Sequence, residues 1–178
     1  LEARILCEID CGGRQLPLHA FSLGNRDPGV PAIGIFGGVH GLESIGAQVV
    51  IAFLQSILSR LRWDTTLQRQ LERLRLVFVP VVNPGGMWRR TRANPRGVDL
   101  MRNAPLEARE SAPFLIGGHR LGPRLPWYRG PAGGPMEAEA AALCQVVDGE
   151  LLSHRFSMVV DCHSGFGLSD RIWFPYAH

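Results

Sequence analysis

The chain has 178 residues, which is enough for one domain with a sizeable core, and 46% of them are hydrophobic. The formal charge of +3 is mild, and no stretch of about 18 apolar residues occurs, so the composition argues against a nucleic-acid-binding or a membrane-spanning protein. The four cysteines are scattered, without Cys-x-x-Cys spacing. They indicate reduced thiols, so we expect a cytoplasmic location.

The first half of the chain predicts strands followed by helices. Two strands, at 4–10 and 14–23, flank a hairpin turn, and a buried strand follows at 31–36. Apolar residues at helical spacing predict a helix over 42–62, and a shorter amphipathic helix is expected at 65–74.

The second half continues this alternation around a long irregular segment. A strand is predicted at 76–82, a helix over 136–152, a strand at 156–162 and a final short strand near 171–174. The segment 84–135 is rich in Pro, Gly and Arg, and an irregular stretch of this length argues for function. The pattern predicts one α/β domain over 1–178, with a mixed, mostly parallel β-sheet flanked by helices on both faces.

Two histidines and a glutamate are placed where an α/β sheet would hold a metal. His40 and Glu43 follow the strand at 31–36, and His163 follows the strand at 156–162. Residues just past the carboxyl ends of strands form the sites of open α/β sheets, and two His plus one Glu is a catalytic zinc ligand set. We therefore predict one zinc per chain at these residues. Cys162 is an alternative ligand, but adjacent strand residues face opposite sides, so we expect it to point away.

Five motifs occur in order along residues 31–178. They are His40-Gly41-Leu42-Glu43, Asn83-Pro84-Gly85-Gly86, Thr91-Arg92-x-Asn94 leading into Gly97-Val98-Asp99-Leu100-Met101-Arg102-Asn103, Met136-Glu137-x-Glu139, and Asp161-Cys162-His163-Ser164. Together they resemble the zinc carboxypeptidases and, more loosely, the succinylglutamate desuccinylase and aspartoacylase branch of the same superfamily. The resemblance implies the zinc-carboxypeptidase fold, with His40, Glu43 and His163 binding Zn²⁺.

The resemblance also implies roles for three further residues. Asp99 would accept the ring N–H of a ligand histidine that does not face the metal, and so fix the tautomer of that histidine. Arg92 would stabilise the oxyanion of a tetrahedral intermediate, although Arg89 or Arg90 could fill that role instead. Arg102 would bind a substrate carboxylate, for which a planar guanidinium is suited.

Two departures from the family pattern stand out. Met101 occupies the position where the family usually has Asn, and a thioether is a poor hydrogen-bonding partner for a terminal carboxylate. The family's general base is a Glu on a late strand, whereas Asp170 is the only carboxylate after His163. We therefore expect the base beyond residue 178, and the chain to be an incomplete domain that lacks its C-terminal part.

The function predicted from these residues is a zinc-dependent hydrolase of amide bonds, most simply a metallocarboxypeptidase-like peptidase that uses a zinc-activated water. One alternative is an N-acyl-amino-acid deacylase of the desuccinylase/aspartoacylase type, and another is a non-catalytic zinc- or ligand-binding relative. The substrate would be a peptide or an N-acyl amino acid. A nucleic-acid partner is not expected, despite several arginines near Trp88. No membrane partner is expected. The sequence leaves the oligomeric state open.

Overall fold

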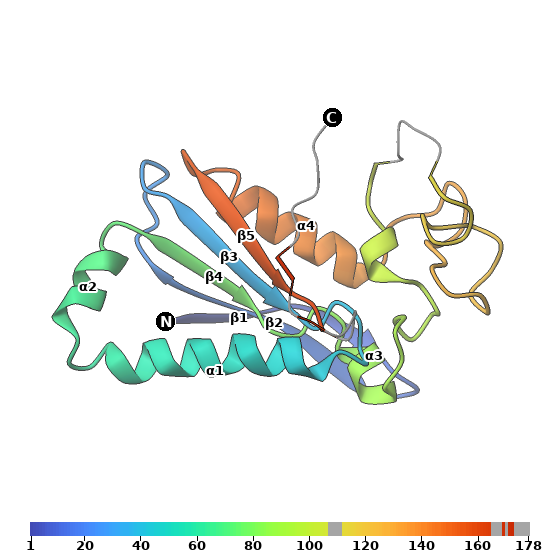
Figure 1. The fold of residues 1–178 in the computed structure, drawn as a ribbon, viewed down its shortest axis with the longest axis horizontal. Helices are drawn as coiled ribbons and strands as arrows, with labels where there is room; N and C mark the ends of the chain where they lie inside the picture. The colour runs from blue at the N-terminus through green and yellow to red at the C-terminus, as the bar shows by residue number, and fades with distance from the viewer. Residues whose placement is uncertain (107–111, 165–168, 170, 173–178) are drawn as a thin grey trace.

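The structure, a computed structural model, describes residues 1–106, 112–164, 169 and 171–172. Its centre is an open sheet of five strands (Figure 1). They are β1 (Glu2–Asp10), β2 (Gln15–Gly24), β3 (Ala32–Gly37), β4 (Arg75–Val79) and β5 (Ser157–Cys162), in the order β1-β2-β4-β3-β5. The pairs β1/β2 and β2/β4 are antiparallel, whereas β4/β3 and β3/β5 are parallel. The sheet is therefore mixed, as predicted, but among the described residues its pairs divide evenly between the two types, so it is not mostly parallel as expected.

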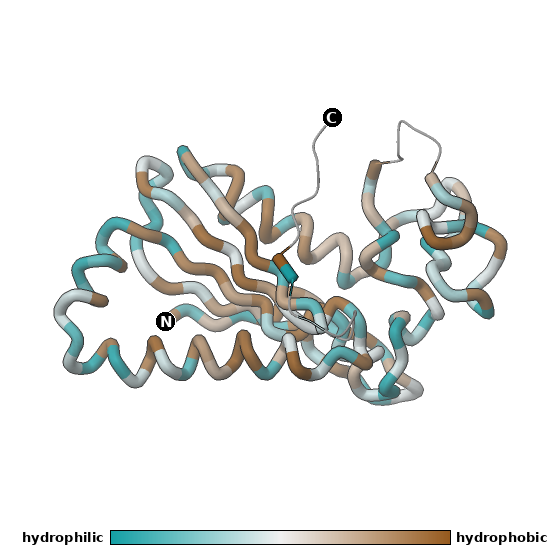
Figure 2. Tube along the Cα trace, in the orientation of Figure 1, coloured by the Kyte–Doolittle hydropathy of each residue, from teal (hydrophilic) through white to brown (hydrophobic). Residues whose placement is uncertain are grey.

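Helices cover both faces of this sheet, which confirms the predicted fold class. α1 (Ser44–Arg60) and α2 (Thr65–Leu71) lie on one face, and α4 (Ala138–Glu150) lies on the other (Figure 1). Each face has its own buried cluster, and β4 contributes to both because successive strand side chains point to opposite sides. Phe78 packs in the cluster under α1, and Val77 packs in the cluster under α4. Figure 2 shows the apolar residues concentrated on the central strands and along α1.

The predicted strands agree with the structure to within one or two residues, with two larger differences. β4 ends at Val79 and not at 82, because Pro80 has no N–H to donate to a neighbouring strand. Of the strand predicted near 171–174, Arg171 and Ile172 are not in a strand, and the remaining residues lie outside the described part of the chain.

The long segment at 84–135 is less irregular than its sequence pattern predicts. It contains the helix α3 (Pro84–Arg89) and the 3-10 helix η1 (Leu100–Arg102). Each begins with a side-chain cap: Asn83 accepts a hydrogen bond from the amide of Gly86, and Asp99 accepts one from the amide of Met101. These helices are too short to show a hydrophobic period, so only their capping residues could have predicted them.

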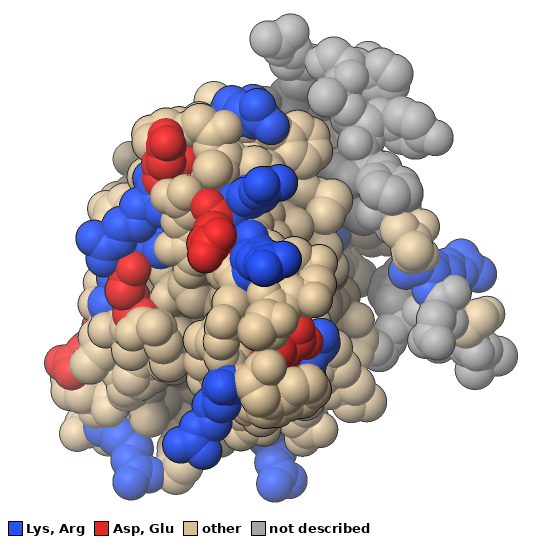
Figure 3. All heavy atoms as spheres, turned by 90° about the vertical axis from the view of Figure 1, so that its left-hand side faces the viewer, with Lys and Arg blue, Asp and Glu red and all other residues tan. Residues whose placement is uncertain are grey.

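The surface mixes both signs of charge. In the face shown in Figure 3, Arg side chains are interspersed with Asp and Glu. Among the described residues, no single helix is long and apolar enough to cross a membrane. α1 and α2 meet the length and composition criteria only as a pair, and that pair is bent by 114° at the junction.

A buried charge network closes the end of the sheet where β4 begins. The buried Arg75 guanidinium donates to both carboxylate oxygens of Glu2, at 3.1 Å each, and to Glu150 at 2.9 Å. Glu150 also accepts from the Ser22 hydroxyl at 2.8 Å and pairs with Arg4. The network therefore joins β1, β2, β4 and α4 through one cation.

We predict that Glu2→Gln makes stability less dependent on pH. Hydrogen bonds from Arg75 and Arg26 lower the pKa of Glu2 from 4.5 to about 2. A lowered folded-state pKa contributes stability that is present above about pH 4.5 and is lost as the pH falls toward 2. Since Glu2 is partly exposed, solvent screening limits the loss in the variant at pH 7 to about 1 kcal/mol.

Urea unfolding of wild type and Glu2→Gln at pH 7, 5 and 3 measures this effect. The difference in unfolding free energy should shrink between pH 5 and pH 3. A difference that stays constant over this range would contradict the proposed ionic contribution.

Candidate metal centre

The structure brings the three predicted zinc ligands together. His40 lies in the turn after β3, Glu43 is the N-cap residue of α1, and His163 follows β5. One potential ligand atom from each residue lies within 4.8 Å of those of the other two. His40 and Glu43 are buried, whereas the side chain of His163 is 30% exposed. The cluster is therefore reached from solvent on the His163 side.

Two glycines allow the backbone segments to converge there. A Cβ on Gly41 would overlap the backbone of Gly86 in α3, and a Cβ on Gly46 would overlap the carbonyl oxygen of Cys162. The first contact seats the ligand turn on α3, and the second places the first turn of α1 directly under the end of β5. Any larger side chain at Gly46 would push His163 away from Glu43.

A hydrogen bond holds His40 and Glu43 in contact. His40 Nδ1 lies 2.8 Å from Glu43 Oε1, and the amide of Ser164 donates to Glu43 Oε2 at 2.9 Å. Burial alone would lower the pKa of His40, but Asp99 and Glu43 outweigh it and the pKa is raised. Burial works against ionisation of Glu43 too, yet bonds from His40 and Ser164 lower its pKa. The carboxylate is therefore available as a metal ligand.

Asp99 lies behind His40, as the resemblance implied. This carboxylate is 1% exposed, and its Oδ1 lies 3.2 Å from His40 Nε2. Burial opposes its ionisation, but contacts with His40 and Arg92 lower the pKa of Asp99. An ionised Asp99 accepts the Nε2 proton of His40 and leaves Nδ1 directed at Glu43 and the metal position. The same carboxylate caps η1, so the helix and the histidine tautomer depend on one residue.

Of the three candidate arginines, Arg92 is the one in contact with the cluster. Its Nε donates to Asp99 Oδ2 at 2.9 Å, and Nη1 lies 3.9 Å from Glu43 Oε1. Arg90 adopts a left-handed conformation, φ 55°, at the end of α3 and turns the chain back toward the cluster. Arg89 instead donates to the carbonyl of Pro95 at 3.0 Å. The geometry therefore favours Arg92 for the electrophile.

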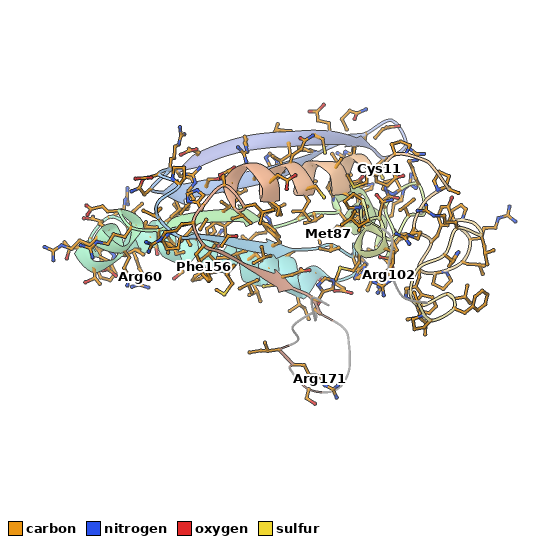
Figure 4. All side chains as sticks on the ribbon, turned by 90° about the horizontal axis from the view of Figure 1, so that it is seen from above. Cys11, Arg60, Met87, Arg102, Phe156 and Arg171 are labelled. Carbon is orange, nitrogen blue, oxygen red and sulfur yellow. The ribbon has the colours of Figure 1, made fainter. Side chains whose placement is uncertain are left out.

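Arg102 lies at the same end of the sheet but is engaged with the long loop. Figure 4 shows it on the side of the molecule that carries Met87, away from Arg60 and Phe156. Its Nε donates to the carbonyl of Ile116 at 3.0 Å, and neighbouring Met101 is 39% exposed. Substrate binding by Arg102 stays a prediction.

Cys162 does not join the cluster of His40, Glu43 and His163, whereas Asp161 contacts one of its members. Cys162 packs, partly buried, against the apolar cluster under α1, and burial followed by the nearby Asp161 raises the pKa of its thiol. Asp161 Oδ2 lies 3.0 Å from His163 Nδ1. This contact was not predicted from the sequence, because His163 follows the end of β5 and strand alternation does not extend to it.

This fold and cluster agree with a family match. The family model described as zinc carboxypeptidase matches residues 11–178. The chain therefore belongs to the zinc carboxypeptidase family.

Two curated relatives are similar to parts of the chain. The inactive metallocarboxypeptidase ECM14 of Arthroderma otae is 28% identical over 188 aligned residues, which cover 93% of this chain and 30% of the relative. Carboxypeptidase SOL1 of Arabidopsis thaliana is 30% identical over 92 residues, which cover 50% of this chain and 19% of the relative. The chain thus spans less than a third of the length of either relative.

Solved structures support the fold. A metallo-carboxypeptidase from Burkholderia cenocepacia has a TM-score of 0.56 at 18% identity, covering 92% of this chain and 36% of that structure. Thrombin activatable fibrinolysis inhibitor has a TM-score of 0.62 at 20% identity, covering 85% of this chain and 41% of that structure. At these identities the likeness concerns the fold alone.

Replacing Asp99 by Asn should weaken zinc binding about 10- to 100-fold. The amide keeps an oxygen that can cap η1, but it removes the charge that holds His40 in its ligand tautomer. Zinc dissociation constants from competition with a chelating dye would measure the change, with circular dichroism to confirm that the variant is folded. Unchanged affinity in a folded variant would contradict the role of Asp99.

Gly46→Ala should damage the cluster through packing alone. The added methyl overlaps the Cys162 carbonyl, so we expect a loss of about 1–3 kcal/mol in stability and weaker zinc binding. Gly149→Ala is the matched control, because Gly149 lies in the helix α4 and a Cβ added there meets no atom within 4 Å. Thermal unfolding should show the control unchanged or stabilised by about 0.5–1 kcal/mol. Equal effects in both variants would mean that the close approach at Gly46 is unimportant.

Proposed function

We propose that this protein is a zinc-dependent hydrolase of amide bonds, acting as a metallocarboxypeptidase-like peptidase on peptide substrates. The observation that carries the proposal is the convergence of His40, Glu43 and His163, with ligand atoms within 4.8 Å of one another. Membership of the zinc carboxypeptidase family supports it. Two imidazoles and one carboxylate form a donor set that suits Zn²⁺ and leaves a coordination position for water or substrate.

The residues of the site divide the chemistry between them. Zinc, when bound, lowers the pKa of a coordinated water and polarises a substrate carbonyl. His40, Glu43 and His163 would hold the ion, and Asp99 keeps His40 oriented. Arg92, close to Glu43 and about one-third exposed, is placed to meet a carbonyl oxygen as it gains negative charge.

A non-catalytic relative is the second candidate. ECM14, which is 28% identical to this chain, is named an inactive metallocarboxypeptidase. Met101 supports this alternative, since a thioether does little to hold a terminal carboxylate. The deacylase activity predicted as a further alternative would use the same ligands on an N-acyl amino acid.

Elemental analysis tests the metal centre first. We expect about one zinc per chain in wild type and a much lower content in His163→Ala, which removes one of three ligands. His154→Ala is a suitable control, because His154 bonds the carbonyl of Val30. Failure of folded wild type to take up zinc, even after zinc is added back, would refute the proposal.

Substrate assays then separate the candidate activities. Release of the C-terminal residue from blocked dipeptides supports the peptidase, and cleavage of N-acyl amino acids supports the deacylase. We expect Arg92→Ala to lower any such activity by about 100-fold or more, because it removes an oxyanion partner. A zinc-loaded full-length protein that cleaves neither substrate would be a binding relative.

A further inference from the structure

A second polar cluster is buried at the first turn of α4, outside the metal centre. Asn94 Nδ2 donates to Glu137 Oε2 at 2.9 Å and lies 3.3 and 3.4 Å from the two carboxyl oxygens of Glu139. Glu137 is 4% exposed and Glu139 is 1% exposed. Two acidic side chains therefore share one amide group with almost no access to solvent.

Two carboxylates in such a place do not both ionise easily. Like charges at short distance in a poorly solvated site repel strongly, and one proton shared between them relieves the repulsion. The nearby cation, Arg96, lies 3.6 Å from Glu137 but is largely exposed, and it only weakly opposes the rise in the pKa of Glu139. Glu139 faces Glu137 and the partly buried Cys7, whose pKa it helps to raise. Burial is the largest influence on Glu139 and, with Glu137, raises its pKa despite bonds from Asn94 and its own amide.

The same amide shapes the loop that serves the metal centre. Asn94 Oδ1 accepts hydrogen bonds from the amides of Arg96 and Val98, both at 3.0 Å. These bonds close the turn between Arg92 and Asp99, the two residues that reach the metal ligands. If Asn94 turned away from the two acids, both amides would lose their acceptor.

A second tie fastens the other end of this loop. The amide of Glu137 donates to Asn103 Oδ1 at 2.7 Å, and Asn103 Nδ2 donates to the carbonyl of Arg129 at 2.9 Å. Residues 92–103 are thus attached to the start of α4 at both ends. The position of Asp99 behind His40 is determined between these two attachments.

We propose that Glu137 and Glu139 form an acid pair that holds one proton and one negative charge, and that this pair positions the loop 92–103 against the metal ligands. Glu139 carries the proton and Glu137 carries the charge. Both are positioning residues, because they act through Asn94. The effect on zinc affinity rests on the proposed function, whereas the effect on the loop is independent of it.

Amide hydrogen exchange at Arg96 and Val98 tests the proposal in metal-free protein. Glu139→Gln mimics the neutral acid and should keep wild-type protection at neutral pH. Glu139→Ala removes the acceptor and should reduce protection at both amides about tenfold. Asp148→Asn, at an exposed position of the same helix, is the matched control and should change neither amide.

The pH dependence distinguishes an acid pair from simple packing. A raised folded-state pKa favours the protonated form, so the stabilisation is complete below the unfolded pKa near 4.5 and declines as the pH rises through the folded value. As the pH rises from 5 to 9, wild-type protection at Arg96 and Val98 should therefore fall more steeply than that of Glu139→Gln, which lacks the titrating carboxyl. Identical pH profiles would overturn the proposal, and this comparison holds even if Glu139→Ala does not fold.

Zinc affinity provides the last readout. Glu139→Ala should raise the zinc dissociation constant about tenfold, and Glu139→Gln should restore it. Loss of affinity in both variants would overturn the proton-bearing role of Glu139. A wild-type protein that binds no zinc would refute the proposed function, while the exchange comparison would still decide whether the acid pair holds the loop.

Discussion

The metal centre depends on the parallel pairing of β3 with β5. Their register places Gly37 opposite Cys162, so the chain leaves both strands at the same level of the sheet. His40 and His163 follow these ends, and their ring centroids lie 5.0 Å apart. α1 completes the arrangement because Gly46 lets its first turn approach the end of β5. The hydrogen bonds of the backbone ladder thus set the distance between two side chains that are remote in sequence.

Polar contacts extend outward from that pairing in successive layers. Asp99 contacts the ligand His40, and Arg92 contacts Asp99. The loop carrying both is shaped by Asn94, which is bound in turn to the acids at the start of α4. Each layer is buried or half-buried, so each group needs its partner to avoid a desolvation cost. A substitution several residues from the candidate metal ligands can therefore alter their positions through hydrogen bonds alone.

The opposite end of the sheet also holds a cluster of buried charged groups, but there the carboxylates bind an arginine. Arg75 is buried among carboxylates there, but those groups are fully ion-paired and line no metal cluster among the described residues. At the end that holds the candidate metal site, the carboxylates face imidazoles, and the possible ligand atoms lie within 4.8 Å of one another. The contrast explains why one buried charge cluster stabilises the fold and the other suits a cation.

The succession of the main strands and helices along the chain could be predicted from the sequence, because apolar spacing indicates which face of each element is buried. His40, Glu43 and His163, which were predicted from their places after strands, do lie together, since the ends of neighbouring parallel strands meet at one edge of the sheet. The sequence left Arg89, Arg90 and Arg92 as alternatives, and the fold selects among them. The left-handed conformation of Arg90 reverses the chain direction, so Arg92 contacts the cluster and Arg89 does not. The contact between Asn94 and the acid pair likewise depends on packing: Asn94 lies 43 residues before Glu137, and no local pattern shows which polar groups meet once they are buried.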